Sequence, residues 1–357
     1  SEQALPLLDE ARQRFEAIAK ARASKAAERM ASVCFAEQGD CLRDLGRLDE
    51  AAVAYEEGIR SAEQRGANRD VATGKGQLGT VRMQQRRYPE ALAAYEEARK
   101  HFTQLDEPGT VAGSWHQIGI VYQAAGQPEA AEDSYRNSLA ITVRLGDVAG
   151  QARTLSQLGM LYDSPLGRTE EAVSFLRQAV EKYAEVKNVE REGRHRSNLA
   201  VYLRKLHRLD EAREEIRQAI ECKAQFGHAA QPWTSWSILA DIEADTGNPT
   251  AAAGAKGKAI TSYLAYRRAG GENHDTPGRI ALAVTEALRA GTAAEAAALL
   301  QQQAPDYDAA GLGGFIRALQ AIVAGSRDRT LADAPDLSYT MSAEILLLLE
   351  TLEKMRK

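Results

Sequence analysis

The chain has 357 residues, 27% of them charged, and a formal net charge of −5. This acidic balance argues against a general nucleic-acid-binding protein, which would normally be basic, and no apolar run approaches the ~20 residues that span a bilayer. The hydrophobic content of 44% is too high for a disordered chain, and the three cysteines indicate free thiols in a reducing cytoplasm. We therefore expect a folded, cytoplasmic protein that binds neither nucleic acid nor membrane.

Residues 1–23 predict a single helix. Ala11 and Phe15 have counterparts in Ala51 and Tyr55, which follow one repeat later along the chain. We interpret this segment as the second helix of a repeat whose first helix is missing. Because the sequence also lacks an initiator methionine, we expect an excised piece of a longer protein, with an effector part removed from its N-terminal side.

Residues 24–268 predict six repeats, each of about 40 residues, which is within the range of known helical repeats. One alanine marks each repeat and recurs at an almost constant interval, at Ala51, Ala91, Ala131, Ala172, Ala212 and Ala252. A fixed period in this range is typical of a solenoid, in which each repeat buries its apolar face only against its neighbours. Only the third interval, from Ala131 to Ala172, is longer, by a single position in the turn of the fourth repeat, residues 163–168, where we expect a harmless loop insertion.

The second repeat shows the expected architecture. Apolar residues at helical spacing predict one helix over residues 70–85 and a second over residues 89–104. Gly79 on the first helix is expected to lie where Ala91 of the second must approach closely, while Tyr95 fills the space to the next helix. Each repeat is therefore a helix, a short turn, a second helix and a loop.

The repeat pattern fades beyond residue 268. Residues 269–277 predict a linker, and residues 278–357 a degenerate repeat followed by capping helices. We place the degenerate pair of helices within residues 278–303 and further helices near residues 312–324 and 341–356. Terminal repeats of a solenoid need such polar-faced caps.

The third repeat carries the fullest signature: Trp115, Ile118, Gly119 and Tyr122 on its first helix, then Ala131 and Tyr135 on its second. This pattern resembles the tetratricopeptide repeat, and Leu158, Gly159 and Tyr162 provide a second match. The standard unit is shorter, at about 34 residues. The longer unit of this chain is similar to the repeats of kinesin light chain and of bacterial STAND signalling ATPases. The resemblance implies an all-α, right-handed α-solenoid of helix-turn-helix repeats with C-terminal capping helices.

The same resemblance places ligand contacts on the first helix of each repeat, which lines the concave groove of such arrays. Two positions before the small anchor residue, four consecutive repeats carry a side-chain amide: Gln77, Gln117, Gln157 and Asn198. In kinesin-light-chain-like arrays an asparagine at this position holds the backbone of an extended peptide, and an amide suits that task because it both donates and accepts. The alternative is that these amides cap or bridge neighbouring helices.

Basic residues follow in the fourth and fifth repeats. We assign Arg153, Arg194, Arg204 and Lys205 to the groove, together with His116 in its more neutral middle. Such a basic stretch would attract an acidic peptide or a phosphate. The alternative is a solvated helix face whose arginines pair with carboxylates of the same chain. In the sixth repeat we assign Trp236 to the core; Trp233 is the better candidate for an exposed anchor, although a structural role is expected for it too.

No motif of an enzyme is found. Residues 74–79 match G-x-G-x-x-G, but a dinucleotide site needs a preceding strand, and these glycines lie within a predicted helix. Walker, zinc-protease and nucleophile-elbow motifs are absent from the sequence. We expect no catalytic residues, no cofactor and no metal.

The sequence therefore favours recognition. We expect a scaffold or sensor array, the recognition part of a larger bacterial signalling protein, which binds a protein or peptide or another domain of its own full-length chain. Two alternatives remain open: a small-molecule-responsive sensor of the STAND type, and a structural spacer without a groove ligand.

Overall fold

The structure is a computed structural model that describes residues 2–355, and within that range it contains eighteen α-helices, two short 3-10 helices and no strand. The expected α-solenoid of helix-turn-helix repeats is confirmed. The chain divides into two compact units, residues 1–187 (unit 1) and residues 188–357 (unit 2). None of the described helices is both long and apolar enough to cross a membrane.

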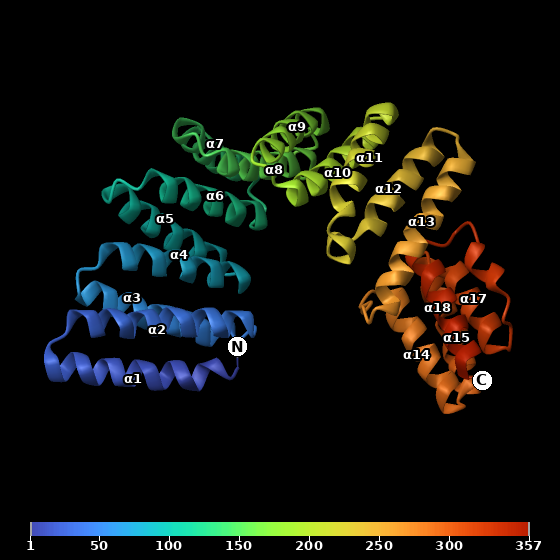
Figure 1. Ribbon diagram of the computed structural model, residues 1–357, viewed down its shortest axis with the longest axis horizontal. Helices are drawn as coiled ribbons and strands as arrows, with labels where there is room; N and C mark the ends of the chain where they lie inside the picture. Colours follow the sequence, from blue (N-terminus) through green and yellow to red (C-terminus); the bar gives the residue numbers. More distant parts are fainter. Residues whose placement is uncertain (1, 356–357) are drawn as a thin grey trace. The chain divides into compact units, whose positions relative to one another are not determined.

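Unit 1 is built from antiparallel helices of nearly equal length. They are α1 (Ala4–Arg22), α2 (Lys25–Asp44), α3 (Leu48–Gln64), α4 (Asn68–Gln84), α5 (Tyr88–Gln104), α6 (Pro108–Ala124), α7 (Pro128–Leu145), α8 (Val148–Asp163) and α9 (Thr169–Glu185). Each helix packs against the next one along the chain, and the stack can be followed from blue to green in Figure 1.

A glycine and a tyrosine hold the two helices of a repeat together. A Cβ atom at Gly119 of α6 would lie 2.5 Å from the ring of Tyr135 of α7, so only glycine lets the ring pass. Gly39 stands in the same relation to the ring of Tyr55. The nearest side chain to both glycines is thus the tyrosine. At Gly159 a Cβ atom would also lie 3.3 Å from the carbonyl oxygen of the repeat alanine Ala172, and Ala131 is fully buried.

The turns between helices share one backbone conformation. A residue with positive φ occurs in each successive turn from position 46 to position 247, and it is Gly in seven turns and Arg86, Asp106, Lys187 and His207 in the others. In the turn after α6, Gly126 N–H donates to the carbonyl of Gln123 and Gln127 N–H to that of Tyr122. This is the Schellman pattern, which satisfies the last carbonyls of a helix. The longer turn of the fourth repeat keeps the next helix in phase, since Ala172 and Leu176 of α9 remain fully buried.

Unit 2 starts with two helix pairs and ends in a helical cluster. Its elements are α10 (Val189–Lys205), α11 (Leu209–Ala224), η1 (Gly227–Ala230), α12 (Pro232–Asp245), α13 (Pro249–Arg268), α14 (Thr276–Ala290), α15 (Ala293–Gln302), α16 (Ala304–Ala309), α17 (Gly313–Val323), η2 (Arg329–Asp333) and α18 (Tyr339–Met355). The last helices form a separate apolar core around Phe315, Leu319 and Leu349.

The cluster is joined to α13 by polar contacts. The carboxylate of Glu344, 2% exposed on α18, accepts from Tyr263 at 3.1 Å and from Asn273 at 3.0 Å and lies 3.2 Å from Arg267. Lys256 occupies the tyrosine position of the sixth repeat and donates to the carbonyl of Leu337 at 2.8 Å. The repeat pattern therefore ends at a residue whose partner lies in the C-terminal segment.

Candidate ligand-binding surfaces

Three of the predicted amides lie on consecutive first helices of unit 1. Gln77, Gln117 and Gln157 lie on α4, α6 and α8 and are half-buried at equivalent positions of their repeats. Within residues 2–355 the side chains of Gln117 and Gln157 have no hydrogen-bond partner, and Gln77 has only a long contact of 3.5 Å to Asp40. The alternative of helix bridging is therefore observed for Gln77 alone.

Gln77 also lines a cavity of about 230 Å³ between α2, α3 and α4. Val33 and Ala36 of α2 and Ile59 of α3 supply its apolar wall, and Val33 is 41% exposed. At about 30 Å³ per water molecule the space corresponds to roughly seven or eight waters, which is more than enough room for one apolar side chain. The cavity was not predicted from the sequence.

Charged side chains surround this cavity. Arg69 pairs with Glu107 at 2.8 Å, and Asp70 lies 3.5 Å from Arg65. Arg29 is exposed, and among the described residues it has no carboxylate within ion-pair distance. An unpaired cation therefore lies next to the apolar space.

His116 does not face a groove, which corrects the prediction. It is 3% exposed on α6, its Nδ1 lies 3.2 Å from Thr154 Oγ1, and its ring packs 5.7 Å from that of Tyr135. Burial, reinforced by Arg153, lowers the pKa of His116 to about 4, so the imidazole is neutral at pH 7. The repeat pattern contains a sign of this burial that the sequence analysis missed. The positions equivalent to His116 in the two neighbouring repeats hold small residues, Gly76 and Ser156.

The predicted basic stretch is divided between the units. In unit 1, Arg153 is exposed on α8. In unit 2, Arg194 is exposed and pairs with Glu190 at 3.3 Å, and Lys205 is exposed at the end of α10. Arg204 joins α10 to α12.

The partners of Arg204 are two carboxylates of α12. Its guanidinium lies 3.1 Å from Asp241 and 2.5 Å from Asp245. The alternative of intramolecular pairing is thus observed for both Arg194 and Arg204. Asn198, the fourth predicted amide, is half-buried on α10, and no hydrogen bond of its side chain occurs within residues 2–355.

The burial of the two tryptophans of the sixth repeat is the reverse of what was expected. Trp233 is only 6% exposed and packs 5.6 Å from the ring of Tyr263 and 5.0 Å from that of Tyr266. Trp236 is partly exposed, with the ammonium of Lys258 4.3 Å above its ring. Trp233 is therefore a core residue and not an exposed anchor.

Sequence reasoning missed one buried cation in unit 2. Lys223 on α11 is 8% exposed, and its Nζ donates to Ser235 Oγ at 2.9 Å. No carboxylate among the described residues lies within ion-pair distance of it. Burial, reinforced by Arg194, lowers the pKa of Lys223 to about 8.

The G-x-G-x-x-G match lies inside α4, as expected, with no strand in the described part of the chain to precede it. Within residues 2–355 no three His, Cys, Asp or Glu side chains are grouped as a metal site.

Comparisons with known proteins agree with this geometry. Family profiles described as tetratricopeptide repeat match residues 34–65, 77–142, 110–185 and 154–217. No curated protein matches the sequence.

Three solved structures show similar folds. The apo form of RapI is 13% identical with a TM-score of 0.59, over 98% of both chains. BtubC (BKLC) from P. vanneervenii is 16% identical with a TM-score of 0.56, over 62% of this chain and 92% of its own. A STAND protein with a tetratricopeptide repeat sensor from Pyrococcus horikoshii is 13% identical with a TM-score of 0.53, over 97% of this chain and 53% of its own. At these identities the likeness concerns the fold alone.

Proposed function

The chain belongs to the tetratricopeptide-repeat family, and from this premise we propose that it is a protein-interaction scaffold whose unit 1 binds an extended peptide. Tetratricopeptide arrays use their repeat surfaces to hold protein partners. The Pyrococcus horikoshii protein is a signal transduction ATPase with such a sensor. By analogy we place this array in a larger signalling protein, which we expect to be cytoplasmic.

The observation that carries the proposal is the row of amides at equivalent positions of α4, α6 and α8. A half-buried amide without a protein partner is costly unless water or a ligand satisfies it. An extended peptide presents an N–H and a C=O at regular intervals, and the amides of Gln117 and Gln157 can pair with both. The row therefore suits a ligand that is recognised through its backbone.

The cavity beside Gln77 supplies side-chain selectivity. An apolar side chain of the peptide would enter between Val33 and Ile59, and an acidic neighbour would pair with Arg29. Burial of a full aliphatic side chain contributes about 1.5–3 kcal/mol, which is more than an exposed ion pair provides. We therefore expect peptides with one branched apolar residue next to an acidic residue.

The test is binding to an immobilised library of peptides of random sequence. We expect Gln117→Ala with Gln157→Ala to lose the bound peptides while its far-ultraviolet circular dichroism stays unchanged. Gln104→Ala is the matched control, since Gln104 is exposed at the end of α5, a second helix of its repeat. Peptides retained equally by wild type and the double variant would refute a role for the amides, and no bound peptide at all would favour the spacer alternative.

A further inference from the structure

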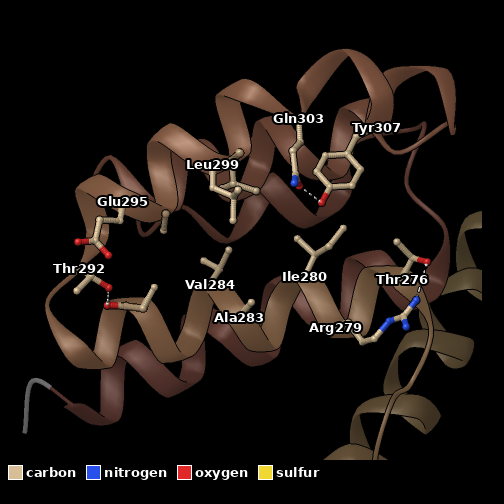
Figure 2. Close-up of a pocket in the computed structure, with 13 residues that line it drawn as sticks. Thr276, Arg279, Ile280, Ala283, Val284, Thr292, Glu295, Leu299, Gln303 and Tyr307 are labelled. Carbon is tan, nitrogen blue, oxygen red and sulfur yellow. Dashed lines mark hydrogen bonds between the residues drawn. The ribbon is translucent and has the colours of Figure 1, made fainter.

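A second cavity lies in unit 2, and none of the predicted site residues lines it. It has a volume of about 480 Å³ between α14 and α15. Figure 2 shows Ile280 and Val284 of α14 on one wall and Leu299 of α15 on the other, with Tyr307 of α16 near one end. The size and the mainly apolar lining are those of small-molecule sites in proteins.

The cavity exists because this helix pair lacks the filling residue of the repeats. Where α6 and α7 cross, the ring of Tyr135 occupies the space above Gly119. The facing side chains of α14 and α15 include Ala283, Ala287 and Ala296, which are too small to meet. Side chains that line an unfilled space lose dispersion contacts, so a ligand that fills it would stabilise the pair.

The two ends of the cavity differ in charge. Figure 2 shows Arg279 with Thr276 at one end and Glu295 with Thr292 at the other. Arg279 has one long contact, 3.4 Å to Thr276 Oγ1, and within residues 2–355 no carboxylate lies within ion-pair distance of it. Glu295 likewise has no cationic partner among the described residues. The first end therefore favours an anion, and the second end disfavours one.

We propose that this cleft binds an amphipathic monocarboxylate with an unbranched apolar tail. The carboxylate pairs with Arg279, and the tail lies between the aliphatic side chains of α14 and α15. From Arg279 to Ala287 the helix rises about 12 Å at about 1.5 Å per residue, and the volume equals that of roughly sixteen waters. A chain of about ten to twelve carbons fits both dimensions. The proposal is independent of peptide binding by unit 1.

The test is calorimetric titration of the full chain with dodecanoate, kept below the concentration at which it aggregates. We expect saturable binding with one site. Dodecanol lacks the charge, and dodecanedioate would place a second anion near Glu295, so both should bind at least about tenfold more weakly, which is the value of one charge-assisted hydrogen bond.

Variants localise the site. Arg279→Gln should weaken dodecanoate binding about tenfold or more, whereas Arg289→Gln, an exposed residue of α14 that does not line the cavity, should leave it unchanged. Ala287→Phe should abolish binding by filling the space, and Arg279→Gln still tests the proposal if that variant fails to fold. Absence of dodecanoate binding to the wild type, equal binding of dodecanedioate, or an unchanged affinity in Arg279→Gln would each overturn the proposal.

Discussion

Replacing Gly119 by alanine tests how the two helices of a repeat fit together. The new Cβ atom would lie 2.5 and 2.6 Å from two carbons of the Tyr135 ring, where ordinary carbon contacts are about 3.5–4.0 Å. The ring cannot move away, because Tyr135 is fully buried and its hydroxyl donates to Gln123 at 2.9 Å. Such overpacking costs about 1–3 kcal/mol, against a gain of about 1 kcal/mol in helix propensity.

Gly113→Ala is the matched control on the same helix. A Cβ atom there would meet nothing within 4 Å, so this variant should gain the propensity term alone, about 1 kcal/mol. The difference between the two variants isolates the packing cost, about 1–3 kcal/mol in favour of Gly113→Ala. Urea unfolding followed by circular dichroism measures it. Equal unfolding midpoints would show that the ring yields freely and that our account of the crossing is wrong.

The fifth repeat suggests a second substitution that would relieve the overpacking of Gly119→Ala. There the equivalent positions hold Ala200 and Ile216, both fully buried. Gly119→Ala combined with Tyr135→Ile recreates this pair, so the two substitutions should be less harmful together than their sum by about 1 kcal/mol or more. Strict additivity would contradict a direct contact between the two positions.

Three further predictions concern buried charge and backbone strain. Burial, reinforced by nearby arginines, lowers the pKa values of His116 and His195 to about 4 from 6.5. Between these two pH values the unfolded chain binds more protons than the folded chain. The stabilisation is therefore complete above pH 6.5 and is lost as the pH falls towards 4, by about 3 kcal/mol per histidine. Urea unfolding at pH 7 and pH 4.5 should show the loss, and His116→Gln should reduce it; identical stability at both values would contradict it. Lys223→Met should stabilise the protein at pH 7 by about 1–3 kcal/mol, because burial lowers the pKa of Lys223 to about 8 from 10.5. Thermal melting should show that this gain in stability shrinks as the pH rises towards 10.5. A gain that does not change with pH would refute the buried charge as its cause. His207 has φ of 57°, so His207→Gly should raise the melting temperature by the equivalent of about 1 kcal/mol, and a lower melting temperature would refute strain at this turn.

The fold was largely predictable, since the constant repeat period and the recurring small and large positions each specify the same helix pair. The backbone conformation of the turns was less predictable. Glycine marks most of the residues with positive φ, but Arg86 and Lys187 have no preference for that conformation, and only the surrounding Schellman hydrogen bonds impose it.

For the candidate site, the sequence predicted the positions of the amides along their helices but not the environment of every residue. Helical periodicity placed Gln117 and Gln157 on the first helices of their repeats, where the structure finds them half-buried. It assigned His116 to the wrong face, because a groove face and the adjacent buried face differ by a single helical step. The pairing of Arg204 with α12 depends on contacts between repeats, which spacing along one helix does not encode.

The longer turn of the fourth repeat has a consequence for how such a chain can vary. One residue added inside a helix rotates everything after it by about 100°, which would swing Leu176 out of the core. Between α8 and α9 the extra residue lies outside both helices, and the helical phase of α9 is preserved. The turns with positive φ, one after each helix of the repeats, therefore let the next helix keep its rotation about its own axis when the turn changes in length. Insertions, tags or grafted loops placed at residues 163–168 should leave every downstream face where it is, whereas the same insertion inside α9 would exchange buried for exposed side chains along the rest of that helix.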